Sequence, residues 1–206
     1  MNHQKKHLTI FHEHLLPEEE IFYNVIAQII INYPLLWNNF INNIIAVKAI
    51  VATKDGFLII NKYLLDNRQT KVLNQIWSKI EKTNAFDPII SSNDFKIYSC
   101  KSRKIIRFFN SNAWLEAIIY YFCIEHDIRI IINPIIINQN LENDLINAYI
   151  QYQQKSFLVK IDGKIIQDKY YNTKIINISL DNTSSDLMYN YDYVKFSKDF
   201  LCFLKH

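Results

Sequence analysis

The chain has 206 residues, of which 50% are hydrophobic, 14% aromatic and 21% charged, with a net charge of +3. This composition excludes an intrinsically disordered chain, and so small a net charge does not by itself indicate nucleic-acid binding. The three cysteines, Cys100, Cys123 and Cys202, form no closely spaced pair, which argues against a zinc site or a disulfide framework.

The N-terminal segment has two lysines but no apolar run behind them, so it does not have the pattern of a secretory signal. Every apolar stretch is interrupted by Asn, Pro or a charged residue before it reaches the roughly 20 residues of a membrane-spanning helix. We therefore expect a soluble cytoplasmic protein without a membrane partner.

In the first half of the chain, Pro17 followed by three glutamates predicts a helix that runs to Pro34. Two β-rich runs around Lys54-Asp55-Gly56 predict a hairpin, and the spacing of apolar residues in TKVLNQIWSKIEK predicts a second helix. Asp87-Pro88 and the polar residues 91–94 mark a domain boundary. Residues 1–94 are thus predicted to form a small, winged-helix-like α+β unit.

The second half begins with two predicted strands, FKIYSC and KSRKIIRFF, and continues with a helix in SNAWLEAIIYYFCIEHD, capped by Ser111 or Asn112. Four β-type runs follow, and then YVKFS as a last strand and KDFLCFLKH as a terminal helix. This order predicts that residues 95–206 form an α/β domain with a mixed sheet and flanking helices.

Glu116 is the single charged residue in the apolar stretch from Ala113 to Ile124. A buried carboxylate is costly unless it is paired, protonated or bound to a metal. The alternative is that Glu116 lies partly solvated in the first helical turn, where the helix dipole favours it.

The segment LENDLINAYIQYQQKSFLVKIDGK predicts a hairpin with its turn at Gln153 and Gln154. Antiparallel pairing then brings Asp144 opposite the neighbourhood of Asp162, and Lys164 points the same way as Asp162 along a continuing strand. Two such carboxylates suit Mg²⁺, and the lysine suits a scissile phosphate or the attacking water. Alternatively, the Asp-Gly pair is an ordinary hairpin turn and Lys164 begins the next strand.

The stretch FFNSNAWLEAIIYY resembles a segment of the restriction-endonuclease-like, PD-(D/E)xK nuclease domain of CRISPR-associated, cyclic-oligonucleotide-activated proteins. Phe109, Asn110, Trp114, Leu115 and Glu116 carry the match, and the resemblance covers roughly residues 95–206. Residues 1–94 do not show the βαβ alternation of the sensing domain that accompanies this nuclease domain. The resemblance implies a role in prokaryotic antiviral defence or nucleic-acid handling.

The family's metal-binding Asp, second acid and lysine correspond here to Ile146, Val159 and Ile161, none of which binds a cation or polarises water. The resemblance therefore implies a degenerate site, that is, a pseudonuclease. Alternatively, the site has shifted and the protein is a Mg²⁺- or Mn²⁺-dependent endonuclease. Its metal ligands would then be Glu116, Asp144 and Asp162, with Lys164 as a further catalytic residue. A third possibility is an unrelated α/β protein.

Four basic residues precede the helix: Lys101, Arg103, Lys104 and Arg107. Such a cluster fits the phosphate backbone of a nucleic acid. It also fits the solvated face of an edge strand, where lysines discourage aggregation. Nucleic acid, another protein or a second copy of the chain are all compatible partners.

Overall fold

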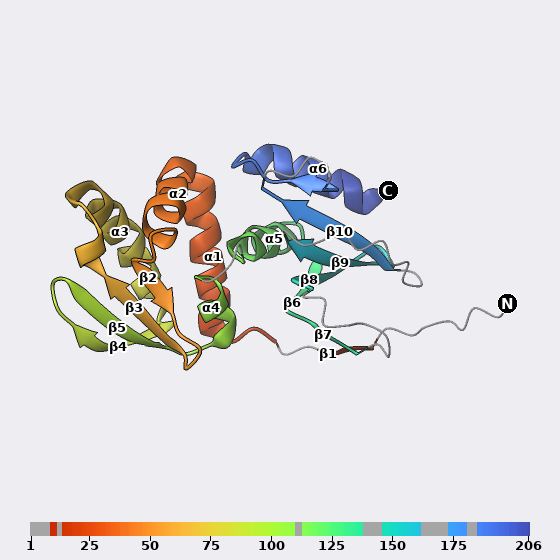
Figure 1. The fold of residues 1–206 in the computed structure, drawn as a ribbon. Helices are drawn as coiled ribbons and strands as arrows, with labels where there is room; N and C mark the ends of the chain where they lie inside the picture. Colours follow the sequence, from red (N-terminus) through yellow and green to blue (C-terminus); the bar gives the residue numbers. More distant parts are fainter. Residues whose placement is uncertain (1–8, 12–13, 110–112, 138–145, 162–172, 181–184) are drawn as a thin grey trace. The chain divides into compact units, whose positions relative to one another are not determined.

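The structure is a computed structural model of the chain, and it describes residues 9–11, 14–109, 113–137, 146–161, 173–180 and 185–206. Contacts divide it into two compact units (Figure 1). We call Leu16–Ile118 the four-stranded unit, and Ile119–His206 together with Met1–Leu15 the five-stranded unit. Both combine sheets with helices, so the predicted class, α/β with a mixed sheet and flanking helices, is confirmed.

The four-stranded unit has an antiparallel sheet in the order β2-β3-β5-β4. Its strands are β2 (Ile50–Ala52), β3 (Phe57–Asn61), β4 (Phe86–Ser91) and β5 (Phe95–Cys100). Its helices are α1 (Pro17–Asn32), α2 (Pro34–Phe40), the π turn η1 (Ile41–Ile45), the 3₁₀ turns η2 (Lys62–Leu64) and η3 (Glu81–Thr83), α3 (Asn67–Ile80) and α4 (Arg103–Arg107).

The helix α3 shows how local sequence sets these elements. The Asp66 side chain accepts from the Gln69 backbone N–H (2.7 Å), and the Gln69 side chain accepts from the Asp66 backbone N–H (2.9 Å), which is a capping box. The predicted apolar stripe then faces inward, since Leu73, Ile76 and Ile80 are buried. Propensity, capping and periodicity all agree here, and this predicted helix is confirmed.

Aromatic side chains fill the space between the helices and one face of this sheet. Trp77 of α3 contacts Tyr98 of β5, with ring centroids 5.2 Å apart, and Phe86 of β4, at 5.4 Å. Phe22 of α1 contacts Phe86 at 6.0 Å. Helices α1 and α3 therefore cover the face of the sheet from which Tyr98 and Phe86 project.

The predicted hairpin around Asp55-Gly56 is confirmed: β2 and β3 pair antiparallel, and Gly56 has a φ of +91°. The boundary predicted after residue 94 differs from the division by contacts, because β5 lies between β3 and β4 in the same sheet. Asp87 and Pro88 belong to β4 and are not a linker. The contact division instead places the end of this unit at Ile118.

The five-stranded unit has a mixed sheet in the order β11-β10-β9-β8-β6. The pairs β6–β8 and β8–β9 are antiparallel, whereas β9–β10 and β10–β11 are parallel. The strands are β6 (Arg129–Ile132), β8 (Ala148–Tyr152), β9 (Lys155–Ile161), β10 (Thr173–Ser179) and β11 (Leu187–Met188), and a separate antiparallel pair is formed by β1 (Thr9–Phe11) and β7 (Ile135–Ile137).

The predicted hairpin in residues 141–164 is confirmed over its described part. Ala148 pairs with Val159 and Tyr152 with Lys155, so the turn lies at Gln153 and Gln154. Both turn residues have positive φ, 46° and 67°, as a two-residue hairpin of the favoured twist requires.

Two helices complete this part of the chain. Helix α5 (Trp114–Glu125) spans the boundary between the units, and its predicted caps, Ser111 and Asn112, lie outside the described residues. Helix α6 (Tyr193–Lys205) begins where YVKFS is predicted as a strand, and that prediction is wrong. The Asp192 side chain caps α6 by accepting from the Lys195 N–H (3.0 Å), and Phe196, Phe200 and Leu204 are buried at helical spacing. None of the helices in the described part is long and apolar enough to cross a membrane.

Candidate functional site

Glu116, the predicted metal ligand in the first turn of α5, is fully buried. Its carboxylate accepts a hydrogen bond from the Tyr23 hydroxyl (3.1 Å to Oε2) and an ion pair from Arg107 (Nη2 to Oε1, 3.2 Å). One of the two expectations from the sequence, that Glu116 lies partly solvated in the first helical turn, is therefore wrong. Glu116 is buried and paired, which is how proteins normally accommodate such a charge.

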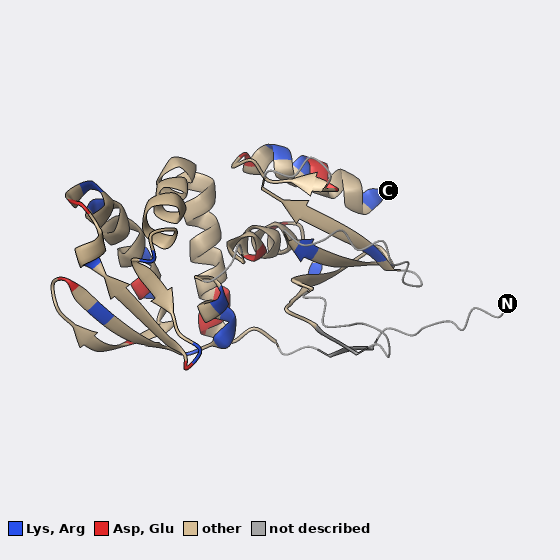
Figure 2. Ribbon diagram, in the orientation of Figure 1, with Lys and Arg blue, Asp and Glu red and all other residues tan. Residues whose placement is uncertain are grey.

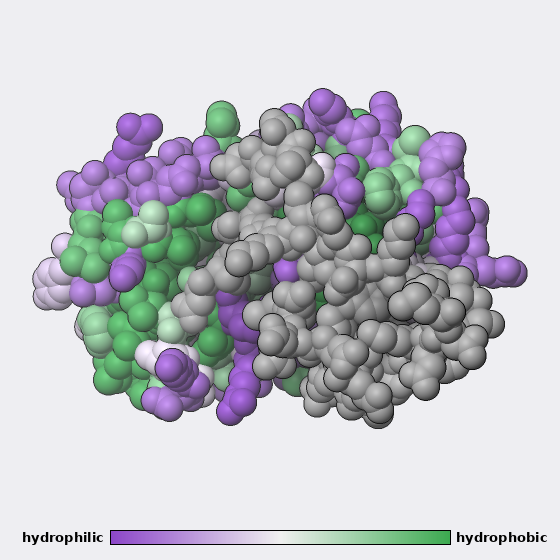
Figure 3. Space-filling model, turned by 45° about the vertical axis from the view of Figure 1, so that its right-hand side comes forward, coloured by the Kyte–Doolittle hydropathy of each residue, from purple (hydrophilic) through white to green (hydrophobic). Residues whose placement is uncertain are grey.

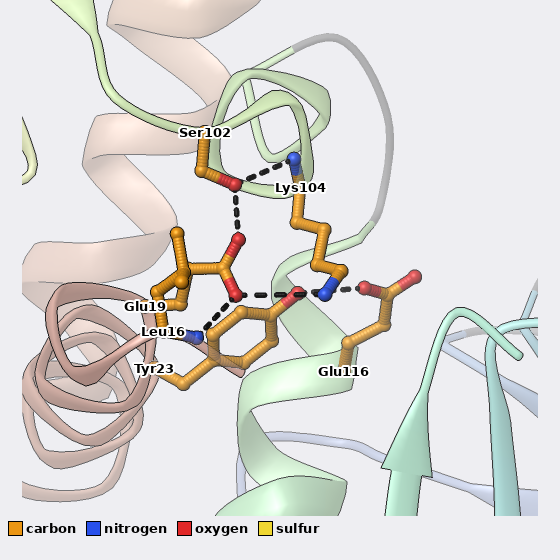
Figure 4. Close-up of polar contacts among 6 residues, drawn as sticks. All are labelled: Leu16, Glu19, Tyr23, Ser102, Lys104 and Glu116. Carbon is orange, nitrogen blue, oxygen red and sulfur yellow. Dashed lines mark hydrogen bonds and ion pairs between the residues drawn. The ribbon is translucent and has the colours of Figure 1, made fainter. Parts of the chain in front are cut away.

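Glu19, near the start of α1, is a second buried carboxylate beside the first (Figure 4). It accepts from the Leu16 backbone N–H (2.8 Å) and from the Ser102 hydroxyl, and it forms an ion pair with Lys104 at 3.5 Å. The first turn of a helix leaves backbone N–H groups without intrahelical partners, and an acid there suits both those donors and the helix dipole.

Helix α4 brings the two cations to these carboxylates. The Ser102 hydroxyl caps the helix by accepting from the Lys104 N–H (3.1 Å), while it donates to Glu19. Lys104 and Arg107 lie three positions apart, so they fall on one side of this short helix. Two acids and two bases thus join α1, α4 and α5 in a charge-balanced cluster, which we call the carboxylate cluster.

The carboxylate cluster also changes the titration of Tyr23. Burial, and then the negative charge of Glu116 and the hydrogen bond to it, raise the pKa of Tyr23 well above its usual value. Tyr23 therefore remains a hydroxyl that donates to Glu116.

The carboxylate cluster connects helices and leaves no carboxylate oxygen without a protein donor. A hard divalent cation needs carboxylate oxygens that are free to coordinate it, but both oxygens of Glu116 and of Glu19 already accept from protein donors. Within the described ranges, His, Cys, Asp and Glu nowhere gather in a group of three or more that could hold a metal ion.

The four basic residues predicted to contact nucleic acid lie at and in α4, not in a strand, because Ser102 caps a helical turn there. Three of them form ion pairs: Lys101 with Asp87 (3.4 Å), Lys104 with Glu19 and Arg107 with Glu116. Figure 2 shows basic and acidic residues together around α4 and the start of α1. In the part of the chain that the structure describes, Arg103 is the member of the group without an ion pair.

The other predicted catalytic residues, Asp144, Asp162 and Lys164, lie outside the described residues. The described ends of the strands next to them are informative. The start of β8 and the end of β9 lie at the same end of the hairpin, because the Asn147 N–H donates to the Val159 carbonyl (2.9 Å).

The positions where the resembled family carries its second acid and its metal-binding Asp are packed with apolar side chains. Val159 is fully buried on β9, and Ile146, just before β8, is also buried. Ile161, at the position of the lysine, is half-buried at the end of β9. A core position of this kind offers no oxygen or nitrogen to a cation.

Sequence reasoning missed several polar residues of the interior. Glu19 and Tyr23 belong to a helix whose acids were interpreted only through the dipole, and they lie far from Glu116 in sequence. Lys160 of β9 and the adjacent Asn147 are buried as well, with the Asn147 side chain accepting from the Ile161 N–H (2.9 Å). The alternation of Lys160 with Val159 and Ile161 would have suggested an exposed lysine, so the sequence contains no signal for its burial.

These features define a mixed α/β protein, and its fold is similar to that of two solved structures. One similar solved structure is protein VC1899 from Vibrio cholerae, with a TM-score of 0.58 and 14% identity over 95% of this chain and 59% of that one. Another is Can2 from Sulfobacillus thermosulfidooxidans in complex with cyclic tetra-adenylate, with a TM-score of 0.53 and 13% identity over 97% of this chain and 58% of that one. The chain thus spans less than two thirds of both proteins. Neither a family model nor a curated protein sequence matches it.

Proposed function

We propose that this protein is a nuclease-fold protein of prokaryotic antiviral defence or nucleic-acid handling whose catalytic site is degenerate. The observation that carries the proposal is the state of Glu116. Its carboxylate is committed to Tyr23 and Arg107 inside the four-stranded unit. In a degenerate site this carboxylate does not bind a metal, and its pairing with Tyr23 and Arg107 instead stabilises the packing of α1, α4 and α5.

Two further observations support the proposal. Val159 and Ile146 occupy the positions where the resembled nuclease domain carries acids, and both are buried. Can2, whose fold is similar, was solved with cyclic tetra-adenylate, which agrees with the sequence resemblance to proteins that respond to cyclic oligonucleotides. On this proposal the protein acts by binding nucleic acid or protein and performs no phosphodiester cleavage.

A second candidate is an active Mg²⁺- or Mn²⁺-dependent endonuclease with a shifted site. Here Glu116, Asp144 and Asp162 would be metal ligands, and Lys164 would contact the scissile phosphate or the water. The observation in its favour is the β8–β9 register. β8 begins shortly after Asp144, β9 ends just before Asp162, and these two strand ends lie at the same end of the hairpin.

The test is cleavage of single- and double-stranded DNA and RNA with Mg²⁺ and with Mn²⁺. It compares the wild type with Asp144→Ala/Asp162→Ala and with the matched surface control Asp199→Ala. We expect all three proteins to leave the substrates intact, and calorimetry to show no stoichiometric uptake of Mn²⁺. Cleavage by the wild type and Asp199→Ala that is lost in the double variant would establish the endonuclease instead.

A further inference from the structure

Helix α3 presents to solvent a side that has cations and amides but no acid. Its buried side includes Leu73, Ile76 and Ile80. On the opposite side the exposed residues include Arg68, Lys71, Asn74, Gln75, Ser78 and Lys79, and the helix contains no Asp or Glu. A helix that only meets water usually intersperses acids and bases, because opposite charges three or four positions apart stabilise it. Helix α3 lacks that compensation.

The three cations of α3 lie in one stripe. At about 100° per residue, Arg68, Lys71 and Lys79 fall within roughly 80° of one another around the helix axis, with Gln75 between them. A rise of about 1.5 Å per residue makes the stripe roughly 16 Å long. We call these three cations the basic stripe, and Lys82, which follows in η3, is also exposed. Figure 2 shows basic residues along this helix.

The charge of the basic stripe is available to a partner, unlike that of α4. Among the residues that the structure describes, none of its three cations forms an ion pair. Lys79 lies over the Tyr33 ring, 5.4 Å from the ring centroid, and this contact leaves its positive charge in place. Lys104 and Arg107 of α4, in contrast, are each paired with a buried carboxylate.

The acids that flank α3 are held by other groups. At the start of the helix, the Asp66 carboxylate accepts from the Gln69 N–H (2.7 Å). After its end, Glu81 accepts from the Tyr98 hydroxyl and forms an ion pair with Lys96 at 3.3 Å. These contacts direct both carboxylates toward the fold, so neither neutralises the basic stripe.

The net charge of the chain is concentrated in the four-stranded unit. Residues 16–118 include 12 Lys and Arg and nine Asp and Glu, so this unit carries the whole net charge of +3. Helix α2, which packs against α3, and the turn η1 contain no acid either. This charge distribution attracts a polyanion to the helical side of the unit.

The opposite side of the same sheet does not suit a polyanion. Val51 and Ile90, on the sheet face turned away from α1 and α3, are 40% and 48% exposed. Figure 3 shows a broad hydrophobic area on the left of the view, over the four-stranded unit. Apolar side chains offer nothing to phosphate groups, which leaves the α3 side as the surface of this unit that fits them.

We propose that the basic stripe binds double-stranded DNA, with α3 lying in the major groove. The proposal rests on the proposed function in nucleic-acid handling, and it adds the binding surface and the kind of nucleic acid. The major groove of DNA, about 12 Å wide, admits an α-helix. A duplex carries one phosphate charge per roughly 1.7 Å of its axis, so a length of about 16 Å presents on the order of ten phosphates to the stripe.

The amides of α3 favour DNA over other polyanions. Asn74 and Gln75 are exposed beside the cations, and Asn and Gln side chains pair with the base edges that the major groove presents. An acidic protein has no such edges. The major groove of duplex RNA is deep and narrow, and side chains do not read it.

Fluorescence anisotropy of the full chain with a labelled DNA duplex tests the proposal. Each neutralised phosphate contributes about −0.9 to the slope of log K against log salt, so three contacts lower the affinity roughly 40-fold between about 50 and 200 mM salt. Arg68→Gln/Lys71→Gln should bind at least about tenfold more weakly at the lower salt concentration and should depend less steeply on salt.

A matched control removes the same charge from another helix. Lys195 and Lys198 of α6 are exposed and three positions apart, like Arg68 and Lys71 of α3. Lys195→Gln/Lys198→Gln should therefore bind the duplex like the wild type. All four positions are on the surface, and circular dichroism checks that both double variants keep the fold.

Several results would overturn the proposal. These are a wild type that does not bind the duplex at the lower salt concentration, an unchanged affinity in Arg68→Gln/Lys71→Gln, and an equal loss in the α6 control. Tighter binding of an RNA duplex, or competition by poly-glutamate as strong as that by unlabelled DNA, would overturn the choice of DNA.

Cleavage of the bound duplex with Mn²⁺ is measured separately from binding. Cleavage by a wild type that binds through the basic stripe would contradict the degenerate site and leave the stripe in place. An intact duplex that the wild type does not bind would contradict the basic stripe alone.

Discussion

The Glu116 carboxylate and the Arg107 guanidinium form an ion pair, 3.2 Å between Oε1 and Nη2, in which Glu116 is buried and Arg107 is 33% exposed. The pair joins two groups of residues that the sequence assigns to different tasks, one to metal binding and one to nucleic acid. The charge of each residue is paired with that of the other and is not available for its predicted task. The pair therefore favours a structural role for both residues.

Removal of Arg107 should destabilise the four-stranded unit. In Arg107→Ala, Glu116 stays buried and loses this cationic partner, so we expect a loss of about 1–3 kcal/mol in the free energy of unfolding. Urea unfolding followed by tryptophan fluorescence measures it, because Trp37 and Trp114 are buried in this unit. Arg103→Ala, its exposed neighbour, should change stability by no more than about 0.5 kcal/mol.

A double-mutant cycle separates the ion pair from general damage to the fold. If Glu116 and Arg107 stabilise each other, Glu116→Gln/Arg107→Gln should cost less than the sum of the two single changes. Strict additivity would contradict the pairing.

Tyr23 predicts how the stability responds to alkaline pH. Its pKa is raised by burial and by Glu116, so above the ordinary tyrosine pKa the unfolded chain loses this proton while the folded chain keeps it. The contribution is fully present below that ordinary value and is lost as the pH rises toward the raised one. Tyr23→Phe should thus be less stable at pH 7, by about 1.5–3 kcal/mol for the lost hydrogen bond to a carboxylate, yet lose less stability between pH 8 and 11. Parallel curves for the two proteins would contradict this.

Glu81 predicts the opposite response, at acidic pH. Burial tends to raise its pKa, but the hydrogen bond from Tyr98 and the charge of Lys96, 3.3 Å away, outweigh burial, so the pKa is lowered. Its contribution is present above the ordinary carboxyl pKa and is lost as the pH falls through the lowered value.

Because the Glu81 side chain is 41% exposed, Glu81→Gln should cost less than about 1 kcal/mol at pH 7. The difference from the wild type should shrink as the pH falls below the ordinary carboxyl pKa. Glu20→Gln, at an exposed glutamate of α1, is the control, and a difference that stays constant on acidification would contradict the assignment.

The sequence predicts this fold well where local signals agree and poorly where burial decides. Helix α3 has its cap, its stripe and its charged end, and the hairpin at Gln153 and Gln154 follows from two β-type runs that flank a polar turn. The helical turn at Arg103–Arg107 was mistaken for a strand because Ile105 and Ile106 favour β structure locally, while the Ser102 cap and the acid partners act against that preference.

The carboxylate cluster illustrates the limit for the site. The apolar surroundings of Glu116 in α5 leave two alternatives open, a buried and a partly solvated carboxylate, and the structure shows that it is buried. Tyr23, however, lies 93 residues away in sequence and Glu19 meets Ser102 across 83 residues, and no spacing rule connects residues so far apart.

Val159 provides a direct test of whether the nuclease site is degenerate. Because it is fully buried on β9, restoring an acid there by Val159→Glu places a carboxylate in an apolar core, which should cost several kcal/mol. Val159→Leu, an apolar change of similar scale, should cost about 1–3 kcal/mol. If the site is degenerate, adding Mn²⁺ should leave the urea midpoint of both variants unchanged. A rise in the urea midpoint of Val159→Glu with Mn²⁺, absent in Val159→Leu, would instead reveal further metal ligands around β9. Such a result would favour the endonuclease hypothesis.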